Sequence, residues 1–207
     1  MADKPSNVDG KTYYNRDIRS KLRTGDLLLF RGGGFFSHVI ESVEGGEYSH
    51  SAFVVRWQSR AMVAQAEYPR LEAVPLSVAV EKYSGRVDYF KIKDDAYRNL
   101  NTRKLTVEAT DLLGKPFAVT DLIRVGFLNL FHRPIKKERE PDQALFCSEY
   151  VAHCFFAAGA PLAEGTNHHA VTPDQVSKSA MHENKGPVHW DPEDREAALK
   201  LGIESND

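Results

Sequence analysis

Short apolar runs separated by turn residues fill the first half of the chain. Each run is four to seven residues long and is bounded mostly by charged or polar residues, which is the pattern of β-strands. Only Gln58-Ser59-Arg60 separates the second run from the third, so we expect these two to pair as a hairpin. Together the runs predict an antiparallel sheet or small barrel of about five strands. They are residues 27–30, 51–57, 61–67, 71–76 and 87–92.

Helical patterns take over in the second half of the chain. Asn101 is placed to cap a helix, which Gly114 and then Pro116 bring to an end. Residues 118–131 form a further, rather apolar helical candidate, and a shorter candidate lies earlier, at 36–43. Strands first and helices later predict an α+β fold.

A helix that begins at Cys147 is the most informative of these elements. The apolar positions 147, 150, 151, 154, 155 and 158 repeat at the spacing of one helical face, and Gly159 followed by Pro161 provides the stop. The helix should therefore run about three turns, with Cys147 in its first turn. The positive end of a helix favours a thiolate over a thiol, and the thiolate is the reactive form. Cys147 is thus a candidate nucleophile.

An inert core residue is the alternative interpretation of Cys147, because free cysteine is among the most buried residue types. Cys154 fits that interpretation well, since it lies in the middle of the same apolar face. Seven residues of helix separate the two cysteines by about 10 Å, beyond the reach of a disulfide. Two cysteines that cannot pair in this way favour a reducing compartment or a fold indifferent to redox state.

Composition sets the size and class of the protein. With 207 residues, 42% of them hydrophobic, the chain is long enough for one domain with its own core. We expect that domain at residues 24–185, a tail or short packed helix at 1–23, and an acidic tail at 186–207. The formal net charge of −2 gives no basic field, so a nucleic-acid partner is not expected.

Targeting and membrane signals are weak. The stretch from Met1 to Gly10 is polar, and no apolar run reaches the length that spans a bilayer. We therefore expect a soluble product that is made in the cytoplasm without a signal peptide, and export by a route without a cleaved signal stays open. Residues 118–139 combine the apolar helical candidate with a basic flank. That combination is typical of a packed helix with a solvated loop, or of a lid that faces substrate or contacts a membrane surface.

A cysteine nucleophile needs a base within hydrogen-bond reach and a group that orients the base. Of the eight histidines, His50 is the best candidate, because it stands at the entry of a strand where a sheet would fix its ring. Glu67 closes the next strand, so the expected hairpin brings its carboxylate to the same end as His50. The alternatives are a strand-edge polar residue for His50 and an ordinary exposed charge for Glu67.

Several segments form an ordered set that resembles a known family. They are Gly25–Phe30, Tyr48–Val55, Gln65–Glu67 leading to Val74-Pro75-Leu76, and Phe146–Val151, with Gly114–Phe117 and Val171–Val176 as further landmarks. In order and spacing they resemble the circularly permuted NlpC-type papain-fold cysteine hydrolases, in particular the YiiX-like branch, which is related to the lecithin:retinol acyltransferase group. The resemblance covers roughly residues 24–180.

The resemblance implies a permuted papain-like fold with the nucleophile at a helix N-terminus and the histidine strand ahead of it in the chain. It implies that Cys147 is the nucleophile, His50 the general base and then acid, and Glu67 the residue that orients His50. Backbone N–H groups at the start of the Cys147 helix, with Tyr48 and Ser148, would bind the oxyanion or the substrate. No metal and no organic cofactor is implied.

A zinc site is not expected elsewhere either. His168-His169 and His182 lie in a polar region without Cys or carboxylate ligands at regular spacing.

The function expected from the residues and the resemblance is that of a cysteine hydrolase that cleaves an amide or an ester through an acyl-enzyme. Its substrate would be a peptide, a peptidoglycan amide or a lipid acyl ester, and the apolar segment 118–131 favours lipid. The alternative is a non-catalytic module of the same fold that binds a lipid or a peptide. A further hypothesis is an antibacterial effector delivered into another cell, for which an inhibitor or immunity protein would be a partner.

Overall fold

The computed structural model describes residues 12–13, 18–32, 46–118, 145–163 and 167–189. The helical candidates at 36–43 and 118–131, the basic flank after the second candidate, and most of the two expected tails lie outside the described residues.

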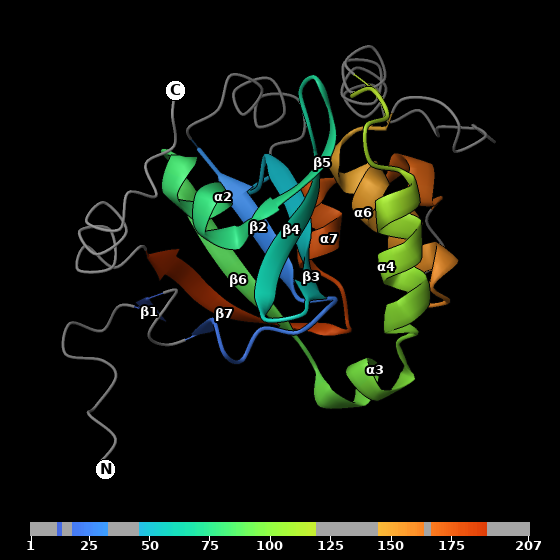
Figure 1. The fold of residues 1–207 in the computed structure, drawn as a ribbon, viewed down its shortest axis with the longest axis horizontal. Coiled ribbons are helices and arrows are strands. Elements are labelled where there is room, and N and C mark those ends of the chain that lie inside the picture. The colour runs from blue at the N-terminus through green and yellow to red at the C-terminus, as the bar shows by residue number, and fades with distance from the viewer. Residues whose placement is uncertain (1–11, 14–17, 33–45, 119–144, 164–166, 190–207) are drawn as a thin grey trace.

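A seven-stranded open sheet forms the centre of the structure, in the order β1-β7-β6-β2-β3-β4-β5 (Figure 1). The neighbours from β7 through to β5 are antiparallel, and the two-residue β1 runs parallel to β7. Because the order has two ends, the sheet is not closed, and the barrel alternative is wrong. The strands are β1 (Thr12–Tyr13), β2 (Leu27–Arg31), β3 (His50–Trp57), β4 (Arg60–Glu67), β5 (Arg70–Pro75), β6 (Arg86–Ile92) and β7 (His182–His189).

The five predicted strands are β2 to β6, and the predicted hairpin joins β3 to β4. The hydrophobic pattern did not predict strand β7 or the two-residue β1. The residues of β7 are mostly polar and include Gly186 and Pro187, so neither alternation nor an apolar run is present. It pairs with β6 through a register shift, buries Val188, and crosses residue 185, where we expected the domain to end.

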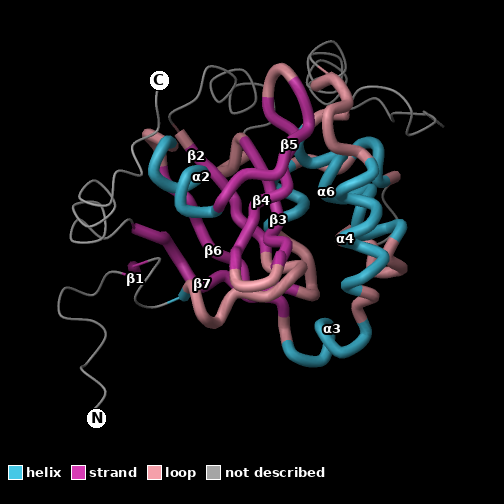
Figure 2. The backbone as a smooth tube through the Cα atoms, in the orientation of Figure 1, coloured by secondary structure: helices cyan, strands magenta, loops and turns pink. Residues whose placement is uncertain are grey.

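Helices pack beside the sheet and complete the α+β fold, as Figure 2 shows. Helix α4 starts where the sequence predicts, because the Asn101 side chain accepts a hydrogen bond from the Lys104 N–H at 2.9 Å. Gly114 follows with a φ of +83°, a conformation that suits glycine at a helix end. The helices are α2 (Leu76–Lys82), α3 (Asp94–Asn99), α4 (Thr102–Asp111), α6 (Cys147–Ala157), the 3-10 helix η2 (His168–Ala170) and α7 (Pro173–Ser177).

Apolar residues cover both faces of the sheet. On one face, Leu27, Leu29 and Phe53 pack with residues of α4 and α6. On the other face, Leu28 and Phe30 pack with residues of α2 and with Ile18 and Leu22 from the N-terminal stretch. Because both faces are buried, the β2 run is apolar throughout instead of alternating.

The stretch that we expected to be a tail or short helix therefore packs on the domain, through a turn in which the Leu22 N–H donates to the Ile18 carbonyl. None of the described helices combines the length and the apolar content needed to cross a bilayer.

Candidate active site

Cys147 is the first residue of helix α6, as the sequence predicts, and it is 1% exposed. Phe146 precedes it as the N-cap with extended backbone, and no side chain caps the helix. The first N–H groups of a helix have no acceptor within the helix itself. The start of α6 can therefore supply backbone donors to a substrate oxygen.

The chain just before α6 is tied to one end of the sheet. Phe117 and Leu145 form a parallel bridge, and the Ala118 N–H donates to the Leu145 carbonyl at 3.1 Å. The Phe117 N–H in turn donates to the carbonyl of Pro69, in the turn between β4 and β5, at 2.9 Å. These contacts place the beginning of α6, and with it Cys147, at the end of the sheet where β4 finishes.

His50 lies at the same end of the sheet, because it opens β3 and β3 runs antiparallel to β4. The ring is partly buried and meets the edge of the Phe30 ring, with centroids 5.0 Å apart. Alternation along β3 puts this ring on the α2 face of the sheet, whereas α6 packs on the opposite face. A contact between Cys147 and His50 therefore has to pass over the end of the sheet.

The hydrogen-bond partner of His50 is Gln65, with 3.3 Å between His50 Nε2 and Gln65 Oε1. The amide nitrogen of Gln65 donates to Glu67 Oε2 at 2.8 Å and to Glu72 Oε1 at 2.9 Å. Glu67, expected from the sequence to orient His50 directly, thus lies one hydrogen bond further away. Among the described residues, Gln65 is the group that orients the imidazole.

Sequence reasoning missed Gln65, although a signal was present. Gln65 is the polar residue inside the apolar run of β4, and it is only 4% exposed. Buried amides need partners, so a glutamine in a core strand two residues before Glu67 points to the same face and to the same neighbours.

Burial lowers the pKa of His50 to about 4, and the hydrogen bond to Gln65 opposes that shift. The ring is therefore neutral at pH 7 and keeps a lone pair that can take a proton. Burial also raises the pKa of Glu67, and the nearby charge of Glu72 adds to the increase.

Tyr48 and Ser148, the expected oxyanion or substrate contacts, have different surroundings. The Tyr48 hydroxyl donates to Asp88 Oδ2 at 3.0 Å, so an oxyanion role would require this bond to be exchanged. Burial raises the pKa of Tyr48, and the charge of Asp88 raises it further, so the hydroxyl keeps its proton. Ser148 is fully buried, and its Oγ has no hydrogen-bond partner in the described part of the chain.

Cys154 lies in the middle of α6 and is fully buried. Burial raises its pKa well above the ordinary value, and the charge of Glu108 raises it further. A thiol in these surroundings stays protonated, which is the inert behaviour expected for a core cysteine. Neither cysteine is in a disulfide.

Carboxylates hold two of the remaining histidines. His169 Nδ1 lies 2.8 Å from Glu149 Oε1, and His153 Nε2 lies 2.9 Å from Glu108 Oε1. The His168 ring lies between them, 4.1 Å from His169 and 5.5 Å from His153 between centroids. Within the described ranges, no three His, Cys, Asp or Glu side chains are grouped so that they could hold a metal ion.

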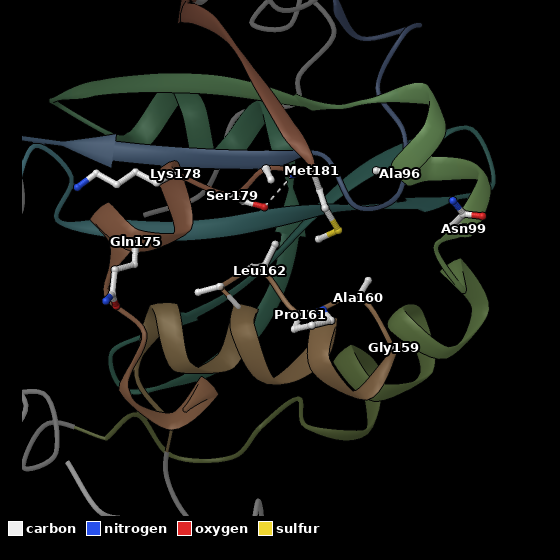
Figure 3. Close-up of a pocket in the computed structure, with 12 residues that line it drawn as sticks. Ala96, Asn99, Gly159, Ala160, Pro161, Leu162, Gln175, Lys178, Ser179 and Met181 are labelled. Carbon is white, nitrogen blue, oxygen red and sulfur yellow. Dashed lines mark hydrogen bonds between the residues drawn. The ribbon is translucent and has the colours of Figure 1, made fainter. Parts of the chain in front are cut away.

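A pocket of about 570 Å³ lies at the far end of α6 from Cys147 (Figure 3). The residues that follow the helix, 159–163, form one wall, and Met181 and Ser179 lie opposite. This pocket is separated from Cys147 by the length of α6.

No family model matches the chain, and no curated protein matches it either. The structure is similar to a crystal structure of metalloprotein yiiX from Escherichia coli O157:H7, with a TM-score of 0.59. The two chains are 18% identical, and the match covers 82% of this chain and 99% of that chain. The similarity shows a YiiX-like α+β fold.

Proposed function

We propose that the chain is a cysteine hydrolase that cleaves an amide or an ester through an acyl-enzyme on Cys147. One observation carries the proposal. A cysteine opens an uncapped helix at the end of the sheet where a neutral histidine is held by a buried amide. That is the set of groups that nucleophilic catalysis by a thiol needs.

The first half of the reaction is acylation. His50 takes the proton of the Cys147 thiol, and the thiolate attacks the carbonyl carbon, so that a C–S bond forms and the carbonyl oxygen becomes an oxyanion. Amide groups of the first turn of α6 stabilise that oxyanion. On collapse the C–N or C–O bond breaks, and protonated His50 gives its proton to the leaving amine or alcohol.

The second half is deacylation. His50, again neutral, takes a proton from water as the water oxygen attacks the thioester. The C–S bond breaks, the acid is released, and the proton on His50 returns to the Cys147 sulfur. Every step uses side chains and backbone of the chain itself, and each requires the Cys147 sulfur and the His50 ring to meet across the end of the sheet.

The substrate belongs to one of two classes, a peptide or peptidoglycan amide or a lipid acyl ester. The structural neighbour is described as a metalloprotein. The described residues of this chain do not fit a metal site, since they group no three side chains of the required kind. We therefore route no step through a metal.

The test is to incubate the protein with a phospholipid mixture and, separately, with peptidoglycan fragments, and to identify released products by mass spectrometry. The Cys147→Ala variant is the test of the nucleophile, and Cys154→Ala is the matched control on the same helix. Fatty acid or lysolipid that depends on Cys147 would assign lipid acyl hydrolysis, and released peptide would assign an amidase or endopeptidase. Full turnover by Cys147→Ala would overturn the proposal.

The burial of Cys147 favours a second candidate, a non-catalytic module that binds a lipid or a peptide, because a thiol 1% exposed is closed to solvent. The rate of alkylation by iodoacetamide separates the two candidates. An activated thiolate reacts faster than a model thiol at the same pH, whereas an inert buried thiol reacts more slowly.

A further inference from the structure

The Gln65 side chain can take two orientations, because its amide presents either the carbonyl oxygen or the NH₂ group to His50. In the structure the oxygen faces His50 Nε2, and the nitrogen faces Glu67 and Glu72. Gln65 is 4% exposed, so water does not compete freely for either end of the amide.

The two carboxylates decide between these orientations. An ionised carboxylate only accepts hydrogen bonds, so the group of Gln65 that faces Glu67 and Glu72 has to be the NH₂. Turning the amide over would replace two attractive contacts, at 2.8 and 2.9 Å, by two contacts between oxygen atoms. With its carbonyl fixed toward His50, Gln65 can only accept, so the proton of the neutral ring has to be on Nε2.

We propose that Glu67 and Glu72 are positioning residues that lock the Gln65 amide and thereby hold His50 as the tautomer with a proton on Nε2 and a lone pair on Nδ1. The inference rests on the proposed function only where it assigns Nδ1 of His50 as the general base. The tautomer itself is a property of the free protein.

The strand register builds this arrangement. Gln65 pairs directly with Glu72 across β4 and β5, and Glu67 follows two positions along β4 on the same face. The two carboxylates hold the same amide from two strands, so the loss of one leaves the other as an acceptor. A replacement at a single carboxylate should therefore have less effect than replacement at both.

The test is the tautomer of His50 at pH 7, read from long-range ¹H–¹⁵N correlations of the imidazole nitrogens in protein with labelled histidine. A His50→Gln spectrum assigns the signals. The double variant Glu67→Met/Glu72→Met removes both acceptors, and Glu67→Asp/Glu72→Asp is the matched control, because each new side chain keeps a carboxylate that only accepts. Circular dichroism checks the folding of each variant.

We expect the proton on Nε2 in the wild type and in the Asp double variant, and a mixture of tautomers in the Met double variant. In the mixture, kcat should fall with the competent fraction, about twofold for equal populations, at unchanged KM. A wild-type proton on Nδ1 overturns the inference, even if no variant folds. A Met double variant that folds and keeps the wild-type tautomer overturns it too.

The failure of this inference and the failure of the proposed function give different results. If the tautomer shifts as expected but the wild type hydrolyses no substrate, the positioning inference is supported and the hydrolase proposal loses its support. If the wild type is active and the Met double variant keeps both tautomer and rate, the hydrolase proposal holds and the positioning inference is overturned.

Discussion

Each end of α6 carries a buried cysteine and lies toward a histidine whose pKa is lowered, but the two histidines differ in their hydrogen bonds. Cys147 begins the helix at the end of the sheet that holds His50. Cys154 lies toward the other end, where the ring of its neighbour Phe155 meets His182 at 5.8 Å. Burial lowers the pKa of both histidines to about 4.

The two histidines have similar lowered pKa values, but they differ in how many of their ring nitrogens are hydrogen-bonded. His182 Nε2 donates to the Gly25 carbonyl at 2.9 Å, and Nδ1 lies 3.2 Å from Ser179 Oγ, so both nitrogens are used. Among the described hydrogen bonds, His50 uses only Nε2. A lowered pKa thus marks burial at both places, and the nitrogen left over marks the candidate site.

The largest difference should appear between the two cysteines. Cys147→Ala removes the proposed nucleophile, so we expect hydrolysis to fall by about 10³-fold or more. Cys154→Ala should keep turnover within about twofold and lose about 1 kcal/mol of unfolding free energy, because it leaves a small gap in the core. Product release by mass spectrometry and urea unfolding measure the two effects. Equal losses of activity in both variants would contradict a special role for Cys147.

The two histidines give the next largest difference. His50→Ala removes the proposed base, and kcat/KM should fall by about 10²- to 10⁴-fold. The alkylation rate of Cys147 should drop in the same variant, since the thiolate loses the group that accepts its proton. His182→Gln should change neither rate at neutral pH. A His50→Ala variant that alkylates as fast as wild type would show that the two groups do not meet.

Gln65→Leu tests the orienting group, and a loss of about 10-fold in kcat is expected because the His50 ring is left without a partner for Nε2. KM should change little, since Gln65 lies behind the histidine. Steady-state kinetics on the substrate identified by mass spectrometry measure both constants. An unchanged kcat would mean that packing against Phe30 is enough to hold the ring.

An effect on stability in acid is expected at the His182 end. Because the folded pKa of His182 is about 4 and the ordinary value is 6.5, the unfolded chain takes up a proton first as the pH falls. The stability that the neutral ring contributes is full above pH 6.5 and is lost toward pH 4. His182→Gln should therefore reduce the loss between pH 7 and 4.5 by about 2 kcal/mol in urea unfolding. The same loss in both proteins would contradict this assignment.

Much of the fold was predictable because periodic apolar residues define it. Strands β2 to β6 and helices α4 and α6 follow from runs, caps and stops that a single segment contains. Strand β7 could not be predicted, since what makes it a strand is pairing with β6 rather than its own polar sequence. The short helix α7 was not predicted either, although Thr172 and Gln175 form a capping box at its start.

Individual residues of the candidate site were predictable from the sequence, but the contacts between them were not. Cys147 at a helix start and His50 at a strand start follow from local pattern. The contact between His50 and Gln65, and the bond from Tyr48 to Asp88 in β6, depend on strand order and on which face each side chain takes. Neighbours across strands in a sheet of this order are not encoded in any one segment.

The bridge between Phe117 and Leu145 has a consequence for how such a protein can diversify. Because residues 118 and 145 are hydrogen-bonded to each other, the two points of the chain that flank residues 119–144 adjoin. Insertions, deletions or whole replacements of that stretch can therefore be accepted without moving the helix that Cys147 begins. Sequence at this position of the chain, beside the candidate site, can therefore vary in length and composition while the sheet and α6 keep their arrangement.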